Sequence, residues 1–166
     1  MIREDIVEKA KKIKLLILDV DGVLTEGSII YDNKGRELRI FNVKDGLGVF
    51  LLTQKGFPVV ILSAKESKVV KRRAKDMGIN DVFSGYPKEK FLDKIIKKYK
   101  VGLEEVAFIG DDLIDIEVAK RVGFSIAVND AVEDLKRIVD FITENKGGKG
   151  AVREVVEIIL QAKDFK

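Results

Sequence analysis

The sequence predicts an α/β fold, in which a Rossmann-like, doubly wound parallel sheet with an inserted β-hairpin makes up one domain over residues 1–166. Three observations support this prediction. Short apolar runs alternate with amphipathic stretches of helical period, and no linker or low-complexity segment interrupts them. The length suits a single domain with a substantial core. Acidic residues directly follow two of the apolar runs, at the position where ligands bind in such sheets.

Apolar periodicity places the strands and the helices. Continuous apolar runs predict strands that are buried on both faces, whereas stretches with one apolar stripe predict helices that cover the sheet. The expected elements, in chain order, are a helix at about 3–12, a strand at 13–18, a hairpin at 28–42, a helix at 45–54, a strand at 59–62, a helix at 66–76, a short strand at 82–83, a helix at 88–99, a strand at 106–109, a helix at 114–122, a strand at 124–128, a short strand at 139–142 and a closing helix from 151.

Turn and cap residues set the boundaries of these elements. In the hairpin, residues 32–35 (DNKG) form a turn between two β-prone arms, and an apolar arm on a small domain indicates a partner surface. Asp45 is expected to cap the helix that follows, and Gly56 to stop it. The stretch at 147–150 lacks the spacing of a phosphate-binding loop, so we expect a flexible hinge within a C-terminal tail of about 146–166.

The composition excludes several kinds of chemistry. Because the chain has no Cys and no His, disulfides, the Ser-His-Asp triad, a His phosphoacceptor and His-ligated zinc are all excluded. The 31 basic and 28 acidic residues are spread along the chain, which argues against a nucleic-acid surface. No apolar run approaches the ~20 residues of a membrane span, and the N-terminus lacks the apolar stretch of a secretory signal. We therefore expect a cytoplasmic protein that binds neither nucleic acid nor membrane.

Carboxylates gather after two of the predicted strands. Asp19 and Asp21 follow the first strand, and Asp111, Asp112 and Asp115 follow the strand at 106–109. The carboxyl ends of parallel strands share one crevice, so the two groups should meet there. Ionised carboxylates that lie this close need a compensating cation, and an all-oxygen ligand set suits Mg²⁺. The alternative, that each Asp merely caps a turn, is reasonable for one residue but not for two groups.

The Asp19-Val20-Asp21 spacing has a chemical interpretation. Residues i and i+2 of an extended chain point the same way, so both carboxylates can approach one phosphorus atom. Asp19 could attack and form an aspartyl phosphate, while Asp21 protonates the leaving oxygen and then takes a proton from water. The Ser63 hydroxyl, and a lysine at 88 or 90, are candidates to hold the phosphoryl oxygens.

The segment Asp19-Val20-Asp21-Gly22-Val23-Leu24-Thr25 resembles the DxDGxxT motif of haloacid dehalogenase superfamily phosphatases. Ser63, a downstream lysine and residues 110–115 (GDDLID) occur in the order of that family's later motifs. The resemblance implies that Asp19 is nucleophile and metal ligand, that Asp21 is acid/base with its carbonyl on Mg²⁺, and that Asp111 completes the metal site. It also implies that Asp112 and Asp115 support the site, and it favours Lys88 over Lys90.

A closer resemblance is to the 3-deoxy-D-manno-octulosonate 8-phosphate phosphatases, a subfamily with no cap domain whose reaction belongs to lipopolysaccharide biosynthesis. Residues 41–46 (FNVKDG), 110–115 and 147–154 (GGKGAVRE) carry it. The resemblance implies a homotetramer assembled through the hairpins, with a neighbouring subunit helping to close the site. It also places a group of substrate contacts, with a C-terminal contact at Arg153. These expected substrate residues are Asp21, Asn42, Val43, Lys44, Asp45, Gly46, Lys65, Arg73 and Lys88.

Two departures from the subfamily bear on the substrate. Ser63-Ala64-Lys65 stands where the subfamily usually has Thr-Gly-Arg, and Phe50 stands where an Arg is common. Ser keeps the hydroxyl and Lys keeps the charge, but the two-pronged contact of Arg is lost. Related phosphatases of nine-carbon sialic-type acids carry an acidic residue at the position of Lys65, so this lysine favours the eight-carbon acid.

Alternatives remain open at this point. The same catalytic residues could serve another sugar phosphate or a sialic-type acid phosphate. A phospho-receiver domain also gathers Asp, a hydroxyl and Lys at strand ends. Three features argue against it: the Asp pair sits on the first strand, the lysine precedes the second acidic group, and 166 residues exceed a typical minimal receiver. A non-catalytic assembly domain is a third alternative, which the intact Asp19 and Asp21 disfavour.

Overall fold

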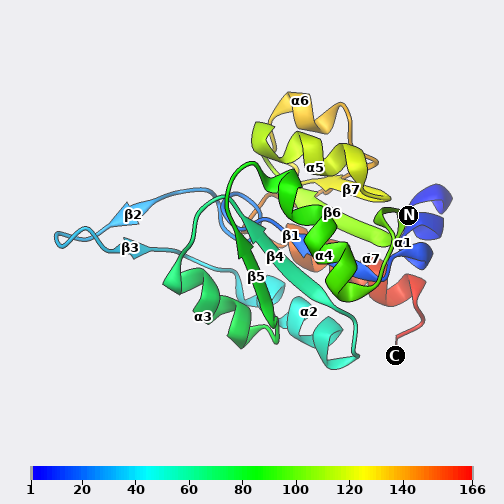
Figure 1. Ribbon diagram of the computed structural model, residues 1–166, viewed down its shortest axis with the longest axis horizontal. Coiled ribbons are helices and arrows are strands. Elements are labelled where there is room, and N and C mark those ends of the chain that lie inside the picture. The colour runs from blue at the N-terminus through cyan, green and yellow to red at the C-terminus, as the bar shows by residue number, and fades with distance from the viewer. Residues whose placement is uncertain (1, 166) are drawn as a thin grey trace.

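The computed structural model describes residues 2–165, and its centre is a six-stranded parallel sheet in the order β5-β4-β1-β6-β7-β8 (Figure 1). β1, β4, β6 and β7 are buried along their whole length, as their continuous apolar sequences predict. The strands are β1 (Leu15–Leu18), β4 (Val59–Ser63), β5 (Asp81–Ser84), β6 (Val106–Gly110), β7 (Phe124–Ala127) and β8 (Phe141–Ile142). The predicted doubly wound sheet is confirmed.

Helices cover both faces of this sheet. α7 packs against both α1 and α2 on one face, and α4 and α5 lie on the other, as right-handed crossovers between parallel strands require (Figure 1). The helices are α1 (Glu4–Lys12), α2 (Val43–Gln54), α3 (Lys68–Asp76), α4 (Leu92–Tyr99), α5 (Ile116–Arg121), α6 (Glu133–Lys136) and α7 (Ala151–Ala162), with short 3-10 turns η1 (Lys88–Phe91), η2 (Leu103–Glu105) and η3 (Leu113–Asp115).

The expected hairpin is present between β1 and α2. Its strands β2 (Ile30–Tyr31) and β3 (Glu37–Leu38) pair antiparallel and project away from the sheet, at the end of the molecule opposite both chain termini (Figure 1). Asp32 makes the turn, because its Oδ1 accepts from the backbone N–H groups of Lys34 and Arg36. Several apolar side chains of the hairpin and of α2 face solvent: Ile29, Ile30, Tyr31, Leu38, Ile40, Val43, Leu47, Phe50 and Leu51.

The expected role of Asp45 as the cap of its own helix is wrong. Asn42 caps α2, since its side-chain oxygen accepts from the backbone N–H of Lys44 at 2.8 Å, and the helix begins at Val43. Asp45 instead caps α7, which begins after a glycine and has no cap of its own. Asp45 Oδ1 accepts from the backbone N–H of Arg153 at 2.9 Å, and the residue is 1% exposed.

Other boundaries differ from the expectations in smaller ways. The expected helices at 88–99 and 114–122 each open with a 3-10 turn, η1 and η3, before α4 and α5 begin. The helix expected from 66 begins at Lys68, because Ser67 is its cap. α6 was not expected, since its single turn carries too few residues for a periodic pattern.

The glycine stretch is a packed turn rather than a hinge. Gly147 and Gly148 are buried, and the Gly148 N–H donates to the Val23 carbonyl at 2.9 Å. A Cβ on Gly147 would lie 1.7 Å from the Gly22 carbonyl oxygen. Only a residue without a side chain allows this approach, so the glycines fasten the last helix to the loop after β1.

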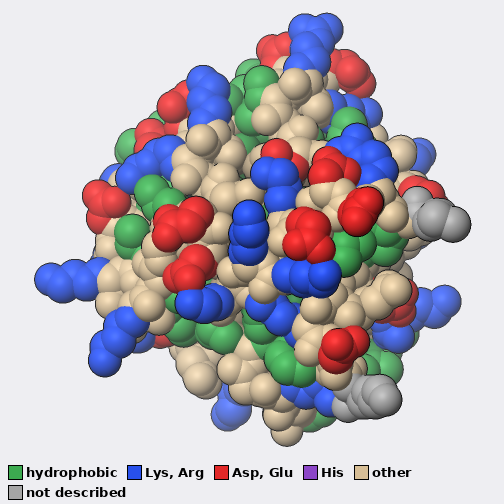
Figure 2. Space-filling view, turned by 90° about the vertical axis from the view of Figure 1, so that its right-hand side faces the viewer, with side chains coloured by type: hydrophobic (Ala, Val, Ile, Leu, Met, Phe, Trp, Pro, Cys, Tyr) green, Lys and Arg blue, Asp and Glu red, His purple; other side chains and the backbone are tan. Residues whose placement is uncertain are grey.

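The surface carries mixed charge. On the face opposite the hairpin, basic and acidic side chains are interspersed (Figure 2). Among the helices in the described part of the chain, none combines the length and the apolar content that a membrane crossing needs.

Candidate active site

Three adjacent strands of the sheet deliver the predicted chemical groups to one edge. Asp19 follows β1, Ser63 ends β4 and Asp111 follows β6, and the sheet places β1 between the other two. The Asp19 N–H donates to the Ile109 carbonyl at 3.1 Å, so the ladder continues past the end of β1. Asp19 and Ser63 are buried, with 5% and 3% exposure. The parallel register therefore brings together residues that lie far apart in the sequence.

Lys88 lies at the centre of this group. Its Nζ is 2.7 Å from Asp19 Oδ1 and 2.7 Å from Asp115 Oδ1, and the lysine is fully buried. Lys90, the other candidate, instead donates to the Tyr86 carbonyl at the surface. Burial alone lowers the pKa of Lys88, but the two carboxylates outweigh it and the pKa is raised. The amine is therefore held charged between its partners.

Asp115 serves mainly to hold other groups in place. One of its oxygens accepts from Lys88, and Oδ2 accepts from the backbone N–H groups of Asp111 at 2.9 Å and Asp112 at 3.2 Å. Asp112 points outward and accepts from the Leu113 N–H, which starts η3. Both residues thus shape the loop after β6.

Asp19 and Asp111 are the carboxylates of this group that keep oxygen atoms able to bind a metal ion. Oxygens of Asp19, Asp111 and Asp115 lie within 4.8 Å of one another, and Lys88 is the one cation paired with them among residues 2–165. Of these carboxylates, Asp19 and Asp111 lie close enough for each charge to act on the other. Burial, followed by the charge of the neighbouring carboxylates, raises the pKa of both. This excess of negative charge and the oxygen-only donors fit Mg²⁺.

The loop after β1 is built to admit Asp111. Gly22 has φ +83°, and a Cβ there would lie 1.8 Å from Asp111 Oδ2. The buried Thr25 hydroxyl accepts from the N–H groups of Gly22 at 3.2 Å and Gly27 at 3.1 Å, so it fixes the turn. The Gly and Thr of the DxDGxxT motif therefore hold the two acidic groups against each other.

Asp21 faces the hairpin rather than the buried carboxylates. Arg39 donates from Nε to Asp21 Oδ1 at 2.9 Å and from Nη2 to Oδ2 at 3.3 Å. Arg39 is a site residue that the sequence analysis does not identify. Glu37 and Arg39 alternate with apolar neighbours on one arm, which puts both on the same side of the strand, and this was the available signal.

The expected substrate residues fall into two groups, of which the first lies between the hairpin, α2 and α3. Lys65 is exposed at the end of β4, with Nζ 2.6 Å from Glu37 Oε1. Arg73 on α3 packs against Gly46, stacks on the Phe41 ring and donates to the Asn42 carbonyl at 3.0 Å. Its buried Nε has no partner within residues 2–165, nor has Asp45 Oδ2.

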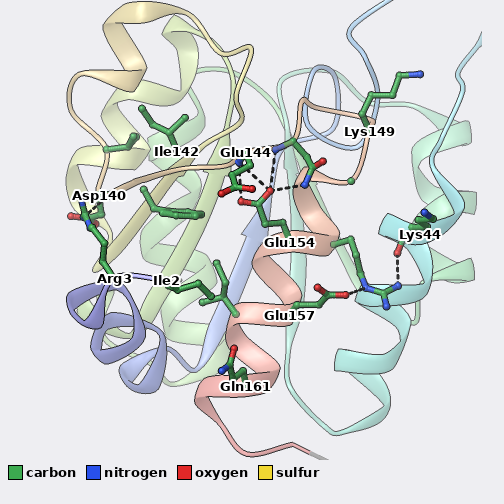
Figure 3. Close-up of a pocket in the computed structure, with 16 residues that line it drawn as sticks. Ile2, Arg3, Lys44, Asp140, Ile142, Glu144, Lys149, Glu154, Glu157 and Gln161 are labelled. Carbon is green, nitrogen blue, oxygen red and sulfur yellow. Dashed lines mark hydrogen bonds and ion pairs between the residues drawn. The ribbon is translucent and has the colours of Figure 1, made fainter.

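The second group lies elsewhere. Lys44 and Arg153 line an open groove of about 820 Å³ between the residues before α1, the start of α2, β8 and α7, and none of the site carboxylates lines it (Figure 3). Arg153 Nε donates to Glu157 Oε1 at 2.7 Å, and Nη1 lies 3.4 Å from the Lys44 carbonyl. Within this chain, the structure does not bring these two side chains to the carboxylates. Val43, at the start of α2, is 80% exposed.

Comparison with known proteins relates this geometry to a family. A model described as haloacid dehalogenase-like hydrolase matches residues 62–155. The 3-deoxy-D-manno-octulosonate 8-phosphate phosphatase KdsC of Escherichia coli (strain K12) is 41% identical over 159 residues, which cover 95% of this chain and 85% of that protein.

Solved structures give the same relation. The crystal structure of the 3-deoxy-D-manno-octulosonate 8-phosphate phosphatase from Yersinia pestis matches with a TM-score of 0.95 and 40% identity, covering 98% of this chain and 89% of that one. The Moraxella catarrhalis phosphatase, in complex with a magnesium ion, a phosphate ion and a KDO molecule, matches with a TM-score of 0.94 and 42% identity, covering 98% and 94%.

Proposed function

Because this chain belongs to the haloacid dehalogenase-like hydrolase family, we propose that it is a Mg²⁺-dependent phosphomonoesterase that hydrolyses 3-deoxy-D-manno-octulosonate 8-phosphate. The observation that carries the proposal is the group of Asp19, Asp111 and Asp115 around Lys88, buried except for the half-buried Asp111, at the edge where three central strands end. The relatives at about 40% identity over nearly the whole chain supply the substrate.

The proposed reaction has two steps. An oxygen of Asp19 attacks phosphorus, the bond from phosphorus to the sugar oxygen breaks, and Asp21 gives that oxygen a proton. Asp21 then takes a proton from water as the water oxygen attacks the same phosphorus. The bond to Asp19 breaks, which releases inorganic phosphate and restores the free carboxylate.

The surrounding residues prepare the groups that react. Lys88 opposes the rise in the pKa of Asp19 and fixes one of its oxygens, so the other is left to attack. The Ser63 hydroxyl donates to the Lys65 carbonyl at 3.2 Å in the structure, and we propose that it turns to donate to a phosphoryl oxygen of the substrate. The groups proposed to hold Mg²⁺ are Asp19, Asp111 and the Asp21 carbonyl, and the bound ion supplies neutralisation of charge on the phosphoryl oxygens.

The substrate acid also carries a carboxylate, which calls for basic groups away from the phosphate. Lys65 and Arg73 lie near the hairpin and fit this need, and Arg73 contacts Asn42 and Gly46. The positive charges of Lys65 and Arg73 would each bind the substrate carboxylate. Lys65 would first have to break its ion pair with Glu37. The exposed apolar side chains of the hairpin and α2 support self-association, which we propose gives a homotetramer. A cytoplasmic location stays a prediction.

A panel of phosphate esters tests this function. Purified protein is assayed for phosphate release with Mg²⁺ and with EDTA, on 3-deoxy-D-manno-octulosonate 8-phosphate, a sialic-type acid phosphate and neutral sugar phosphates. We expect a strong preference for the first substrate and no turnover in EDTA. Metal-dependent turnover of many esters without preference would overturn the substrate, and no turnover of any ester would overturn the enzyme.

A further inference from the structure

Arg39 joins the hairpin to the acidic motif. It follows β3, and its guanidinium makes a two-pronged contact with the carboxylate of Asp21, at 2.9 Å and 3.3 Å. The Arg39 side chain is only 7% exposed, whereas that of Asp21 is 42% exposed. A buried fork that meets both oxygens of a carboxylate fixes the plane of that carboxylate.

The guanidinium is also held from its other side. Nη1 donates to Glu37 Oε2 at 2.9 Å and to the Ser67 hydroxyl at 3.1 Å. Ser67 caps α3, so it belongs to the body of the domain, and Glu37 is tied in turn to Lys65. Contacts with α3 and β3 therefore fix the position of the Arg39 guanidinium, and the guanidinium in turn fixes the orientation of the Asp21 carboxylate.

Asp21 depends on this contact for its orientation. Within residues 2–165, Arg39 is the only side chain hydrogen-bonded to the Asp21 carboxylate. Asp19, in contrast, is fixed by Lys88 and by the sheet. The two carboxylates of the motif are thus held by different contacts, Asp19 by Lys88 and the sheet, and Asp21 by Arg39.

We propose that Arg39 is a positioning residue that holds Asp21 in the orientation needed for proton transfer to the leaving oxygen. This inference rests on the proposed function. The Asp21 carboxylate has about four lone-pair positions, and the fork uses one on each oxygen, so another can carry the proton that Asp21 takes from water in one turnover and gives to the leaving oxygen in the next. Loss of the fork leaves Asp21 in place but free to rotate, which weakens proton transfer and spares the attack by Asp19.

The test compares leaving groups. An alkyl phosphate such as the sugar-acid phosphate needs a proton on its leaving oxygen, whereas p-nitrophenolate leaves without one. We expect Arg39→Gln to lower kcat/KM for the alkyl phosphate about ten- to a hundredfold and for p-nitrophenyl phosphate by less than about threefold. Since kcat/KM covers the steps up to phosphoryl transfer, later hydrolysis of the aspartyl phosphate does not obscure the comparison.

Matched variants make the result specific. Asp21→Asn should give the same leaving-group pattern with a larger loss, and Arg39→Lys, which keeps charge but not the fork, an intermediate one. Arg36→Gln is the control, because Arg36 lies on the same hairpin and pairs with Asp32 in solvent. Thermal unfolding of each variant separates loss of fold from loss of positioning.

The possible outcomes separate the two proposals. Equal losses on both substrates, a faster Arg39→Gln enzyme, or a loss confined to KM would each overturn the positioning role. In these cases Arg39 would be structural, would restrain Asp21, or would bind substrate directly. If the unaltered protein hydrolyses neither ester with Mg²⁺, the proposed function fails before Arg39 is tested.

Discussion

The two charged groups around the acidic motif differ in charge balance and in burial. The strand-edge group sets three carboxylates, Asp19, Asp111 and Asp115, against the single amine of Lys88. The hairpin group sets the carboxylates of Asp21 and Glu37 against Arg39 and Lys65, so its charges cancel. Only the strand-edge group carries more negative than positive charge, and this is why it fits a metal ion and the hairpin group does not.

The degree of burial determines how much stability is lost when an ion pair of either group is broken. Lys88 and Asp115 are fully buried, whereas the Lys65 side chain is 66% exposed. Removing one partner of a buried ion pair costs about 3–5 kcal/mol, while an exposed pair contributes about 0–1 kcal/mol. Changes at the strand edge should therefore have large effects, and changes at the hairpin should act on orientation and specificity.

The largest effect is expected from Asp19→Asn. An amide cannot attack phosphorus, so phosphate release should fall by more than about a thousandfold, while the fold persists because Lys88 keeps Asp115 as a partner. Phosphate release with saturating Mg²⁺ and circular dichroism are the measurements. Substantial residual turnover by Asp19→Asn would contradict the covalent mechanism.

Asp111→Asn tests whether the strand-edge group binds Mg²⁺. In EDTA the variant should be at least as stable as the unaltered protein, because one of three crowded carboxylates is neutralised. Mg²⁺ at 100 times its Kd should raise the Tm of the unaltered protein by about 5–10 °C, and this rise should vanish in the variant. Asp112→Asn, at the exposed neighbour, is the control. A Mg²⁺ response that survives in Asp111→Asn would contradict the assignment.

Lys65→Glu tests the hairpin side for substrate recognition. Reversing this charge should weaken binding of a sugar-acid phosphate about tenfold more than that of a neutral sugar phosphate, since only the acid carries a second anion. KM for the two substrates is the measurement, with Lys68→Glu as the control at a nearby exposed site. Equal losses for both substrates would remove Lys65 from the specificity pocket.

The smallest effect concerns pH. The hydrogen bond from Lys65, with the charges of Lys65 and Arg39, holds the pKa of Glu37 below its usual range. A depressed carboxyl pKa gives stability that is present above the unfolded pKa, about 4.3, and is lost as pH falls through the folded value. Urea unfolding in EDTA should show the unaltered protein losing its advantage over Glu37→Gln below about pH 4. A constant difference between pH 7 and pH 3 would show that this ion pair does not form.

Much of the strand edge could be predicted because its signals are local. The buried strands are continuous apolar runs, and Asp19, Ser63 and Asp111 stand directly at their ends. Parallel pairing then brings these residues together without further information. The predicted resemblance to the haloacid dehalogenase superfamily, which depends on the same segments, is confirmed by the family match and the relatives.

The features that escaped prediction depend on contacts between distant segments. Asp45 has the residue type and spacing of a local cap, but Asn42 lies at the true helix start, and Asp45 is free to cap α7 instead. Arg39 looks like any charged residue on a hairpin until the fold brings the residue after β3 to Asp21 in the loop after β1. The glycines at 147–150 resemble a hinge because their packing partner lies near the other end of the chain.

That last contact has a consequence for the newly made chain. The loop of the acidic motif, which is synthesised early, rests on Gly147 and Gly148, which are synthesised near the end. Contacts between such distant segments form late, because the closing loop is long. A nascent chain still attached to the ribosome at α6 therefore has Asp19 and Asp21 but not the glycines that pack against their loop, and it should complete its active site only when α7 has emerged.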